Sequence, residues 1–240
     1  MKLRAFALAT IVLGLSLLPA LAGAATSPIG QVARITGSQL GNAQAPGAPV
    51  RKLVQGAPIF AGERIRTGAG TVMQIEFTDK SRFVLGPNSE FEVGRYSHAS
   101  GGAEEDAFHS RFIKGAFRFV TGLIARSPKK NMTVSVSVAT IGIRGTHVEG
   151  EVNERQEKGG QAVDASAKVV LLEPDGSDTG GAIVVENKFG SVLIDTPGYG
   201  TEIPDEKSPP SPVKRMQLRT IDNLMRTIRT PGTSGPARRP

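Results

Sequence analysis

The alternation of apolar and polar residues in short runs constrains this sequence more than any other feature. It is clearest over 133–138, where Val134, Val136 and Val138 alternate with hydroxyl side chains. Successive side chains of a β-strand point to opposite faces, so this alternation is typical of a strand with one buried face. Similar runs recur along the chain, each followed within a few residues by Gly, Pro, Asn or Asp. We predict strands at 31–36, 64–67, 72–77, 82–85, 90–96, 111–121, 133–140, 146–152, 168–173, 182–186 and 191–195.

Many short strands and no helical pattern in the body of the chain predict an all-β fold. The 240 residues include 29 glycines and 16 prolines but no cysteine, so turns are frequent and no disulfide can form. We expect an antiparallel β-sandwich or roll of short strands over 29–203, with long surface loops at 37–50 and 97–107. Its core face should contain Val72, Ile75 or Phe77, Phe83, Leu85, Phe91, Val93, Phe117, Phe119, Val134, Val136 and Val138.

Residues 1–24 have the layout of a cleavable signal peptide. Two basic residues precede an apolar run over 5–18, and a proline and several small residues follow. Overlapping small-residue sites predict cleavage after residue 22 or residue 24. The alternative is an uncleaved membrane anchor, but the apolar run is shorter than the ~20 residues that a spanning helix needs. We therefore expect the mature protein to be periplasmic or secreted, with no transmembrane segment after cleavage.

The positive charge of the chain belongs to its C-terminal tail. Residues 207–240 hold eight basic residues and one acidic residue, a net charge of +7. Residues 26–206 hold 19 basic and 21 acidic residues, a net charge of −2. The folded body therefore offers no basic face for nucleic acid, and we expect no nucleic-acid partner.

The region 204–240 divides into a Pro-rich linker, a short amphipathic basic helix and a disordered end. Apolar residues recur at near-helical spacing over 213–229, and basic residues lie between them. We expect residues 213–229 to make peripheral contact with an anionic envelope surface or with a partner protein. The alternative is that the apolar face of this helix packs back on the β domain.

Several ordered blocks of this sequence resemble the FecR domain. Residues 56–68 follow the pattern Gly-x-x-apolar-x-x-Gly-Glu-x-apolar-x-Thr-Gly, and an apolar strand follows at 72–77. Later blocks lie at 115–122 and 139–146, and the last is similar to the most distinctive signature of the family. The resemblance covers about residues 56–152. It implies a non-enzymatic signalling, sensing or protein-interaction module of the cell envelope, whose partner is an unidentified periplasmic or envelope protein.

The sequence departs from the family in two places. The best-known FecR proteins have a cytoplasmic anti-sigma segment before a membrane span, whereas here a signal-like segment stands first, so we expect a stand-alone exported protein that lacks the anti-sigma segment. The second departure is Asp79-Lys80, where the family commonly has Asp-Gly. Lys80 must adopt a positive φ or use another turn type, which favours a longer and looser connection.

The signature is the candidate interaction loop. Its two glycines permit a positive φ or a close backbone approach at a strand bend. Arg144 offers five donors to loop carbonyls or to a carboxylate such as Glu149. The alternative is a purely structural corner. The candidate residues are Ile141, Gly142, Ile143, Arg144, Gly145 and Thr146.

No pattern in the sequence predicts a catalytic, cofactor or metal site. His147, Glu149 and Glu151 would share one face of a strand and could in principle hold a divalent metal, but a charged outer face explains them more simply. We expect His98 and His109 to face solvent.

Two further sets of polar residues have alternative functions. Glu90 and Glu92 share a strand face, but glycosidase carboxylates normally face each other across a cleft. The hydroxyl row Thr133, Ser135 and Ser137, together with the basic tail, would suit an envelope glycan- or peptidoglycan-binding structural protein. This is the alternative to the interaction module.

Overall fold

The chain folds into strands almost throughout. The computed structural model describes residues 27–37, 40–98, 106–127, 131–158, 161–173 and 181–218, so the predicted signal peptide lies outside the described residues. The one helical element among them is a 3-10 turn, η1 (Ile124–Arg126). The strands are β1 (Gly30–Thr36), β2 (Gly41–Gln44), β3 (Arg51–Leu53), β4 (Pro58–Ile59), β5 (Arg64–Arg66), β6 (Val72–Phe77), β7 (Arg82–Leu85), β8 (Glu90–Ser97), β9 (Ala107–Val120), β10 (Asn131–Val136), β11 (Ala139–Arg144), β12 (His147–Asn153), β13 (Gln156–Lys158), β14 (Gln161–Val163), β15 (Ser166–Leu172), β16 (Ala182–Asn187), β17 (Gly190–Ile194), β18 (Tyr199–Ile203) and β19 (Lys214–Arg215).

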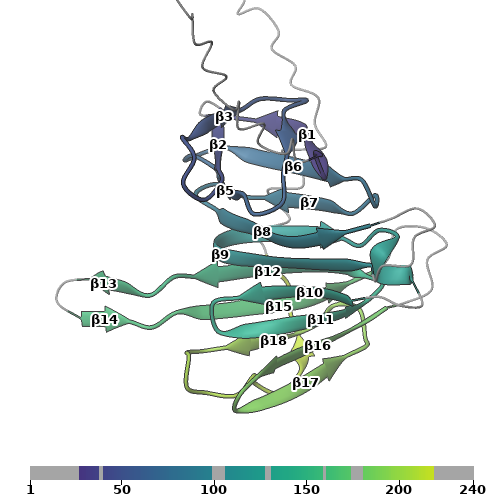
Figure 1. Cartoon of the computed structure of the whole chain (residues 1–240). Coiled ribbons are helices and arrows are strands. Elements are labelled where there is room, and N and C mark those ends of the chain that lie inside the picture. Colours follow the sequence, from purple (N-terminus) through teal and green to yellow (C-terminus); the bar gives the residue numbers. More distant parts are fainter. Residues whose placement is uncertain are drawn as a thin grey trace, which may run out of the picture.

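Apart from β13 and β14, which pair only with each other, the strands form two sheets that share the long strand β9. Figure 1 shows the strands stacked from β2 and β3 at one end to β17 at the other. Sheet A has the order β4-β1-β6-β7-β9-β12-β15-β18-β19. Sheet B has the order β3-β2-β5-β8-β9-β10-β11-β16-β17. Neighbours are antiparallel except β9 and β10, which are parallel. The expected all-β antiparallel class is confirmed.

Gly115 lies where β9 passes from one sheet to the other. The residues before it pair with β8 in sheet B as far as Lys114, and Gly115 itself begins the pairing with β12 in sheet A. Its φ of 96° lies in the left-handed region, and a Cβ there would collide with Ser89. Only glycine meets both demands without strain, so this position allows one strand to serve both layers.

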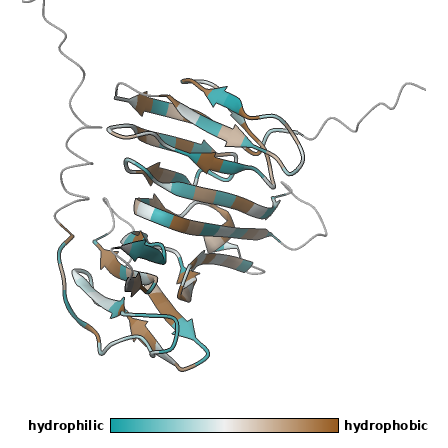
Figure 2. Ribbon diagram, turned by 90° about the vertical axis from the view of Figure 1, so that its left-hand side faces the viewer, coloured by the Kyte–Doolittle hydropathy of each residue, from teal (hydrophilic) through white to brown (hydrophobic). Residues whose placement is uncertain are grey.

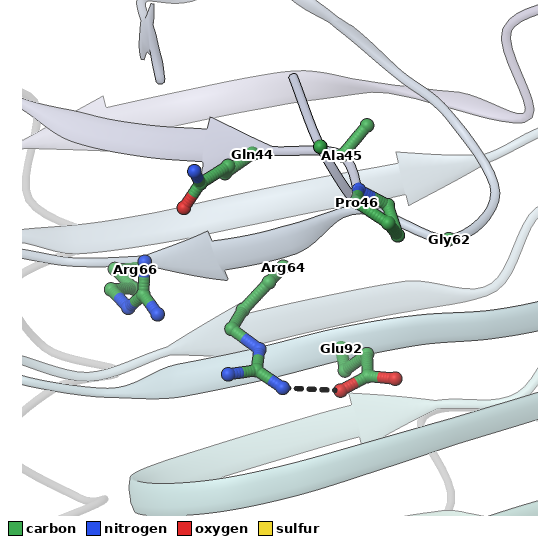
Figure 3. Close-up of a pocket in the computed structure, with 8 residues that line it drawn as sticks. Gln44, Ala45, Pro46, Gly62, Arg64, Arg66 and Glu92 are labelled. Atoms are coloured by element: carbon green, nitrogen blue, oxygen red, sulfur yellow. Dashed lines mark hydrogen bonds and ion pairs between the residues drawn. The ribbon is translucent and has the colours of Figure 1, made fainter. Parts of the chain in front are cut away.

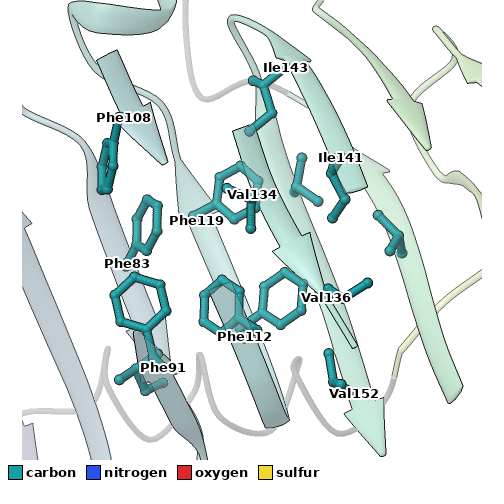
Figure 4. Close-up of a cluster of buried hydrophobic side chains, with 14 of the residues drawn as sticks. Phe83, Phe91, Phe108, Phe112, Phe119, Val134, Val136, Ile141, Ile143 and Val152 are labelled. Atoms are coloured by element: carbon teal, nitrogen blue, oxygen red, sulfur yellow. The ribbon is translucent and has the colours of Figure 1, made fainter. Parts of the chain in front are cut away.

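The core lies between the two sheets and is rich in phenylalanine. Figure 2 shows bands of hydrophobic and hydrophilic residues along the strands. Successive side chains of a strand point to opposite faces, so alternation of this kind places apolar side chains in the core and polar ones outside. Figure 4 shows rings from β7, β8 and β9 packed against aliphatic side chains of β10 and β11. The rings of Phe112 and Phe117 stack with their centroids 3.9 Å apart. The fully buried phenylalanines are Phe77, Phe83, Phe91, Phe108, Phe112, Phe117 and Phe119.

The expected core residues are all buried, but Val72 was assigned to the wrong face. Met73, Ile75 and Phe77 belong to the main core, so Val72 points to the outer face of sheet A. It is nevertheless buried there, in a separate apolar cluster. Gln74 and Glu76, which share this outer face with Val72, are only partly buried, so the burial of Val72 does not extend along the strand.

Some strand predictions were wrong. The run 133–140 is two strands, β10 and β11, because Ser137 and Val138 form a tight turn between them. The predicted loop 37–50 contains β2, whose small and polar residues carry no alternation of large apolar side chains. β2 is held by pairing with β3 and β5, which local sequence does not encode. β9 begins at Ala107 and therefore shortens the predicted loop 97–107.

The C-terminal region also differs from the expectation. Its Pro-rich segment is tied to the domain, because Thr201 Oγ1 donates to the carbonyl of Ser211 at 2.6 Å and Asn187 Nδ2 donates to that of Ser208 at 2.8 Å. The helix expected over 213–229 is wrong for residues 213–218, which are extended and include β19. The rest of the expected helix and the expected disordered end lie outside the described residues. No helix in the described part of the chain is long and apolar enough to cross a membrane.

Candidate functional site

A pocket at one end of sheet A gathers basic side chains from three separate segments. Its volume is about 230 Å³. The β6–β7 hairpin, the segment that follows β9, and the start of β12 each contribute to its wall. We call it the basic pocket, and the residues that line it are Lys80, Arg82, Val120, Thr121, Gly122, Leu123, Arg126 and His147.

A buried carboxylate holds the hairpin against the segment after β9. Asp79 is fully buried, and its Oδ1 and Oδ2 accept hydrogen bonds from the backbone N–H and the hydroxyl of Ser81 at 3.0 and 2.7 Å. The Ser81 hydroxyl in turn accepts the N–H of Gly122 at 2.9 Å, and the Asp79 carbonyl accepts the N–H of Leu123 at 2.7 Å. A Cβ on Gly122 would collide with the Asp79 carbonyl. The pocket wall is therefore set by buried polar bonds.

The turn that precedes Arg82 is tight, which corrects the expectation of a longer and looser connection. The N–H of Phe77 donates to the Ser81 carbonyl at 2.9 Å, and the N–H of Lys80 donates to the Phe77 carbonyl at 3.0 Å. Lys80 has a left-handed backbone conformation, with φ 70°, which is sterically unfavourable for a residue that has a Cβ. Its ammonium group lies 3.8 Å from Glu76 in an exposed pair, so the charge stays at the pocket rim.

The family-like signature joins the pocket through a pair of threonines. The backbone N–H of Thr146 donates to Thr121 Oγ1 at 2.8 Å, and the N–H of Thr121 donates to the Thr146 carbonyl at 3.1 Å. His147, the next residue, lines the pocket. The signature corner and the pocket are thus one structural unit at the same end of the sandwich.

The signature residues divide between core and surface. Ile141 and Ile143 are buried and face the core (Figure 4). Gly145 has a φ of 54°, as a strand bend requires, whereas Gly142 sits in an ordinary ladder position opposite Val184. Arg144 is exposed at the end of β11. The proposed interaction role of the loop therefore falls to Arg144 and the adjacent pocket, and the two isoleucines have a packing role.

The metal ligands considered for β12 do not form a surface row. His147 and Glu149 are 3% and 4% exposed, and Glu151 is partly buried. Glu149 stands directly opposite Arg118 of β9 in the sheet. No group of three or more His, Asp or Glu able to hold a metal occurs among the described residues. The expectation of a charged outer face is wrong for His147 and Glu149, because this face of sheet A is covered.

The other two histidines are also less exposed than expected. His98 Nδ1 lies 3.2 Å from a carboxylate oxygen of Asp106, and the side chain of His98 is 15% exposed. His109 Nδ1 lies 2.6 Å from Thr133 Oγ1. Both side chains are therefore partly buried beside a polar neighbour, rather than fully exposed.

Glu90 and Glu92 take part in ion pairs on the outside of sheet B. Arg64 donates to Glu92 at 3.1 Å, as Figure 3 shows, and Arg66 donates to Glu90 at 3.1 Å. Lys114 lies 3.9 Å from Glu90. A shallow pocket of about 300 Å³ lies beside this ladder. Carboxylates neutralised in this way are poor candidates for acid or base catalysis.

The predicted hydroxyl row lines a third, wider hollow on sheet B. Ser135 and Ser137 border it, with Arg111, Glu186 and Lys188, and its volume is about 520 Å³. Thr133 is not part of its lining, and the Ser137 hydroxyl donates to the Ile113 carbonyl at 2.9 Å. The row therefore exists only in part.

Tyr96 supports the hairpin from the core side. Its hydroxyl accepts the N–H of Asp79 at 2.8 Å and lies 2.7 Å from Thr78 Oγ1. Burial raises the pKa of Tyr96 to about 12, and the nearby Asp79 charge adds to the effect, although the bond to Thr78 opposes it. The phenol is thus held neutral in the folded state.

Sequence reasoning did not identify the basic pocket. Lys80, Gly122 and His147 are separated by 42 and 25 positions in the chain, and each looks like an ordinary surface or turn residue. The one available signal was Asp79-Lys80, the departure from Asp-Gly, which places a cation at a turn that otherwise needs glycine.

Comparison with known proteins gave one match. Residues 63–170 match the family model described as FecR protein, which runs from just before β5 into β15. Neither the curated proteins nor the solved structures gave a match. The resemblance that the sequence blocks indicated is therefore confirmed.

Proposed function

Residues 63–170 match the FecR family model, and from this premise we propose that the chain is a non-catalytic periplasmic module for signalling, sensing or protein interaction in the cell envelope. The observation that carries the proposal is the basic pocket, which the matched domain builds beside its own signature corner. Lys80, Arg82 and Arg126 bring three positive charges to it, and the described residues that line it include no carboxylate. Such a pocket suits an acidic segment of a partner protein.

Exposed groups around the pocket make it accessible to a partner. Leu123 is 51% exposed at its edge, and Arg144 is exposed at the end of the adjoining strand. An apolar side chain beside several basic groups is the composition expected of an interaction surface. The polar bonds among Asp79, Ser81 and Gly122 hold the backbone in place, so binding would require little reordering.

Photo-crosslinking in cells tests this proposal. A crosslinking residue is placed at Leu123 or at Arg144, with Val213, which is 36% exposed, as the control. We expect one protein adduct from the first two positions and none from the third. Arg82→Glu should abolish the adduct, whereas Arg95→Glu, an exposed site on β8, should not. Adducts that are equal at all three positions would rule the pocket out.

The hollow on sheet B favours one alternative, an envelope glycan- or peptidoglycan-binding structural protein. Its wall combines hydroxyls of Ser135 and Ser137 with charged side chains such as Arg111 and Glu186. The described lining holds no aromatic ring on which a sugar could stack, which is why we rank this role second. The alternative predicts that purified cell wall retains the protein at both low and high salt. Ser135→Arg should abolish this retention, whereas Arg82→Glu should not.

Export is the remaining part of the proposal. It rests on residues 1–24, whose basic start, apolar run and small-residue sites have the order of a signal peptide. Mass spectrometry of the protein from its natural host should find a mature start at Gly23 or Ala25. An intact Met1 in a membrane fraction would contradict it.

A further inference from the structure

Strand β17 is a free edge of sheet B. It pairs with β16 on one side, and no strand in the described part of the chain pairs with its other side. Figure 1 shows β17 at one end of the stack of strands. The end strand of a sheet presents a row of backbone N–H and C=O groups with which a further strand can pair. The groups that β17 presents therefore decide what can bind there.

The tight turn before β17 shows which of its backbone groups face the free edge. Asn187 and Gly190 pair across a two-residue turn, so their N–H and C=O groups bond to each other. Bonding alternates along an antiparallel pair, so Val192 also bonds to β16. The N–H and C=O groups of Ser191 and Leu193 point the other way. No backbone group of the described residues bonds to them.

The other three end strands have features that hinder further pairing. β3 contains Arg51 and Lys52, and β19 consists of Lys214 and Arg215. β4 has only two residues, and one of them is Pro58. Charged side chains, proline and a short length are the usual protection of a sheet edge. β17 has five residues, with the sequence Gly-Ser-Val-Leu-Ile, and has none of these features.

The outer face of this edge carries a pair of exposed apolar side chains. Leu193 is 59% exposed, and Val184, which stands directly opposite it on β16, is 37% exposed. Cross-strand apolar neighbours stabilise a sheet when a further apolar side chain packs beside them. The edge therefore suits a partner that supplies both a strand and an apolar side chain.

The two sheets end level on this side of the sandwich. Beyond β9, sheet A continues with the four strands β12, β15, β18 and β19. Sheet B also continues with four, namely β10, β11, β16 and β17. By strand count, sheet A does not extend past β17. A second sandwich with the same level side can therefore meet this edge.

We propose that β17 pairs with the β17 of a second copy of this chain, antiparallel and about a twofold axis at Leu193. In this register the outward N–H and C=O groups of Leu193 bond to those of the same residue in the second copy. The two Leu193 side chains meet between the two Val184 side chains, which forms an apolar strip across the seam. Asp195 stands opposite Ser191, so no charge faces a like charge. Sheet B becomes continuous through both copies.

A second copy is the occupant that this edge fits, because the edge is complementary to itself. A twofold contact places the same patch on both sides, so every group has to tolerate its own copy. Leu193 meets that condition, since an uncharged apolar residue at the axis packs on its own copy. The same operation at Lys52 of β3 would bring two like charges together. The contact is separate from the basic pocket, which lies at one end of sheet A.

The mass of the chain in solution tests the proposal. For the chain purified from its natural host, we expect sedimentation to show a mass that rises from one chain toward two with concentration. Leu193→Lys puts two charges together at the axis and should keep the mass at one chain. Val50→Lys, at a site before β3 that is 56% exposed, should behave like the unmodified chain. A single-chain mass at every concentration, or a dimer that Leu193→Lys does not weaken, would overturn the proposal.

Cysteine crosslinking locates the seam, because the chain has no cysteine of its own. Opposed residues of a bonded antiparallel pair have Cα atoms ~5.5 Å apart, which a disulfide can span. Under oxidation by diamide we expect Leu193→Cys to form a disulfide-linked dimer at least about tenfold faster than Val50→Cys. Equal rates would contradict an axis at Leu193. Crosslinking of Leu193→Cys in cells to a different protein, and never to itself, would replace the second copy with another strand.

Two further variants separate backbone pairing from simple apolar contact. Leu193→Pro removes the outward N–H, and proline is tolerated in an edge strand where its missing N–H faces solvent. Leu193→Val keeps both the N–H and an apolar side chain. We expect Leu193→Val to dimerise and Leu193→Pro to stay at the mass of one chain, with the circular dichroism of both unchanged. The proposal fails if the two variants associate alike.

Discussion

The hydroxyl of Ser81 donates a 2.7 Å hydrogen bond to the fully buried carboxylate of Asp79. The same oxygen accepts the N–H of Gly122, which lies 41 positions further along the chain. One small side chain thus joins the β6–β7 hairpin to the segment that completes the basic pocket. The bond therefore helps to fix the relative position of two segments of the pocket wall.

Ser81→Ala should lower the free energy of unfolding by about 1–3 kcal/mol, because it leaves the buried Asp79 carboxylate short of a donor. Denaturant titration measures this, with Ser191→Ala, an exposed site on β17, as the control. An effect no larger than that of the control would show that the link contributes nothing to stability.

Lys80→Gly should raise the free energy of unfolding by about 1 kcal/mol, because glycine adopts a φ of 70° without the steric cost that lysine bears. Lys188→Gly, in a turn without a positive φ, should not stabilise. The same Lys80→Gly variant should weaken the crosslink at the basic pocket, since it removes a lining cation. We therefore expect Lys80→Gly to raise the stability, measured by thermal unfolding, and to weaken binding, measured by the yield of the adduct.

Tyr96 should make stability fall in alkaline solution. Its pKa is raised to about 12 in the folded protein, from 10.0, so the neutral phenol is favoured by folding. The resulting stabilisation is fully present below pH ~10 and is lost as pH rises toward ~12. Tyr96→Phe should remove this part of the pH dependence and cost about 1 kcal/mol at neutral pH through the lost bond to Asp79. The difference in tyrosinate absorbance between the unmodified protein and Tyr96→Phe should show Tyr96 ionising near pH 12; ionisation of Tyr96 near its ordinary pKa of 10.0 would contradict the argument.

Phe117→Ala should cost about 3–5 kcal/mol, because the ring is buried and stacks on Phe112 in the centre of the core. Phe189→Ala removes the same group from a ring that is 44% exposed and should cost far less. Chemical denaturation of the two variants compares them directly. Similar costs would mean that the stacked pair does not lie in a packed interior.

The last described residues should stabilise the domain. Leu218 and Met216 pack on the outer face of sheet A, so deletion of residues 207–240 should lower the melting temperature, whereas loss of an independent tail would leave it nearly unchanged. Leu218→Ala should cost about 2–3 kcal/mol, whereas Val213→Ala, at a site 36% exposed, should cost little. A melting temperature unaffected by Leu218→Ala would show that this packing does not contribute to the stability of the domain.

Many of the strands could be predicted because the residues that define them are close together in the sequence. β6 and β7 begin and end where alternation and turn residues placed them, and β1, β8, β12 and β15–β17 differ by at most two residues at either end. The ordered blocks that resemble the FecR domain were equally visible, since such motifs are local too. The strands that were not predicted, such as β2 and β18, lack alternating large apolar residues. They form because neighbouring strands pair with them.

By itself, then, the sequence determined the all-β class and most strands, because period-two alternation and turn residues act over a few neighbouring positions. Its ordered motifs also indicated the resemblance to the FecR domain. Only the tertiary structure decided which faces are covered and which distant residues meet. Alternation separates two faces of a strand but does not say that Val72 and Glu149 are buried on the face that points away from the core. Nor does it bring Lys80, Gly122 and His147 to one pocket, since their contact depends on hydrogen bonds that close only when β6, β7, β9 and β12 are side by side.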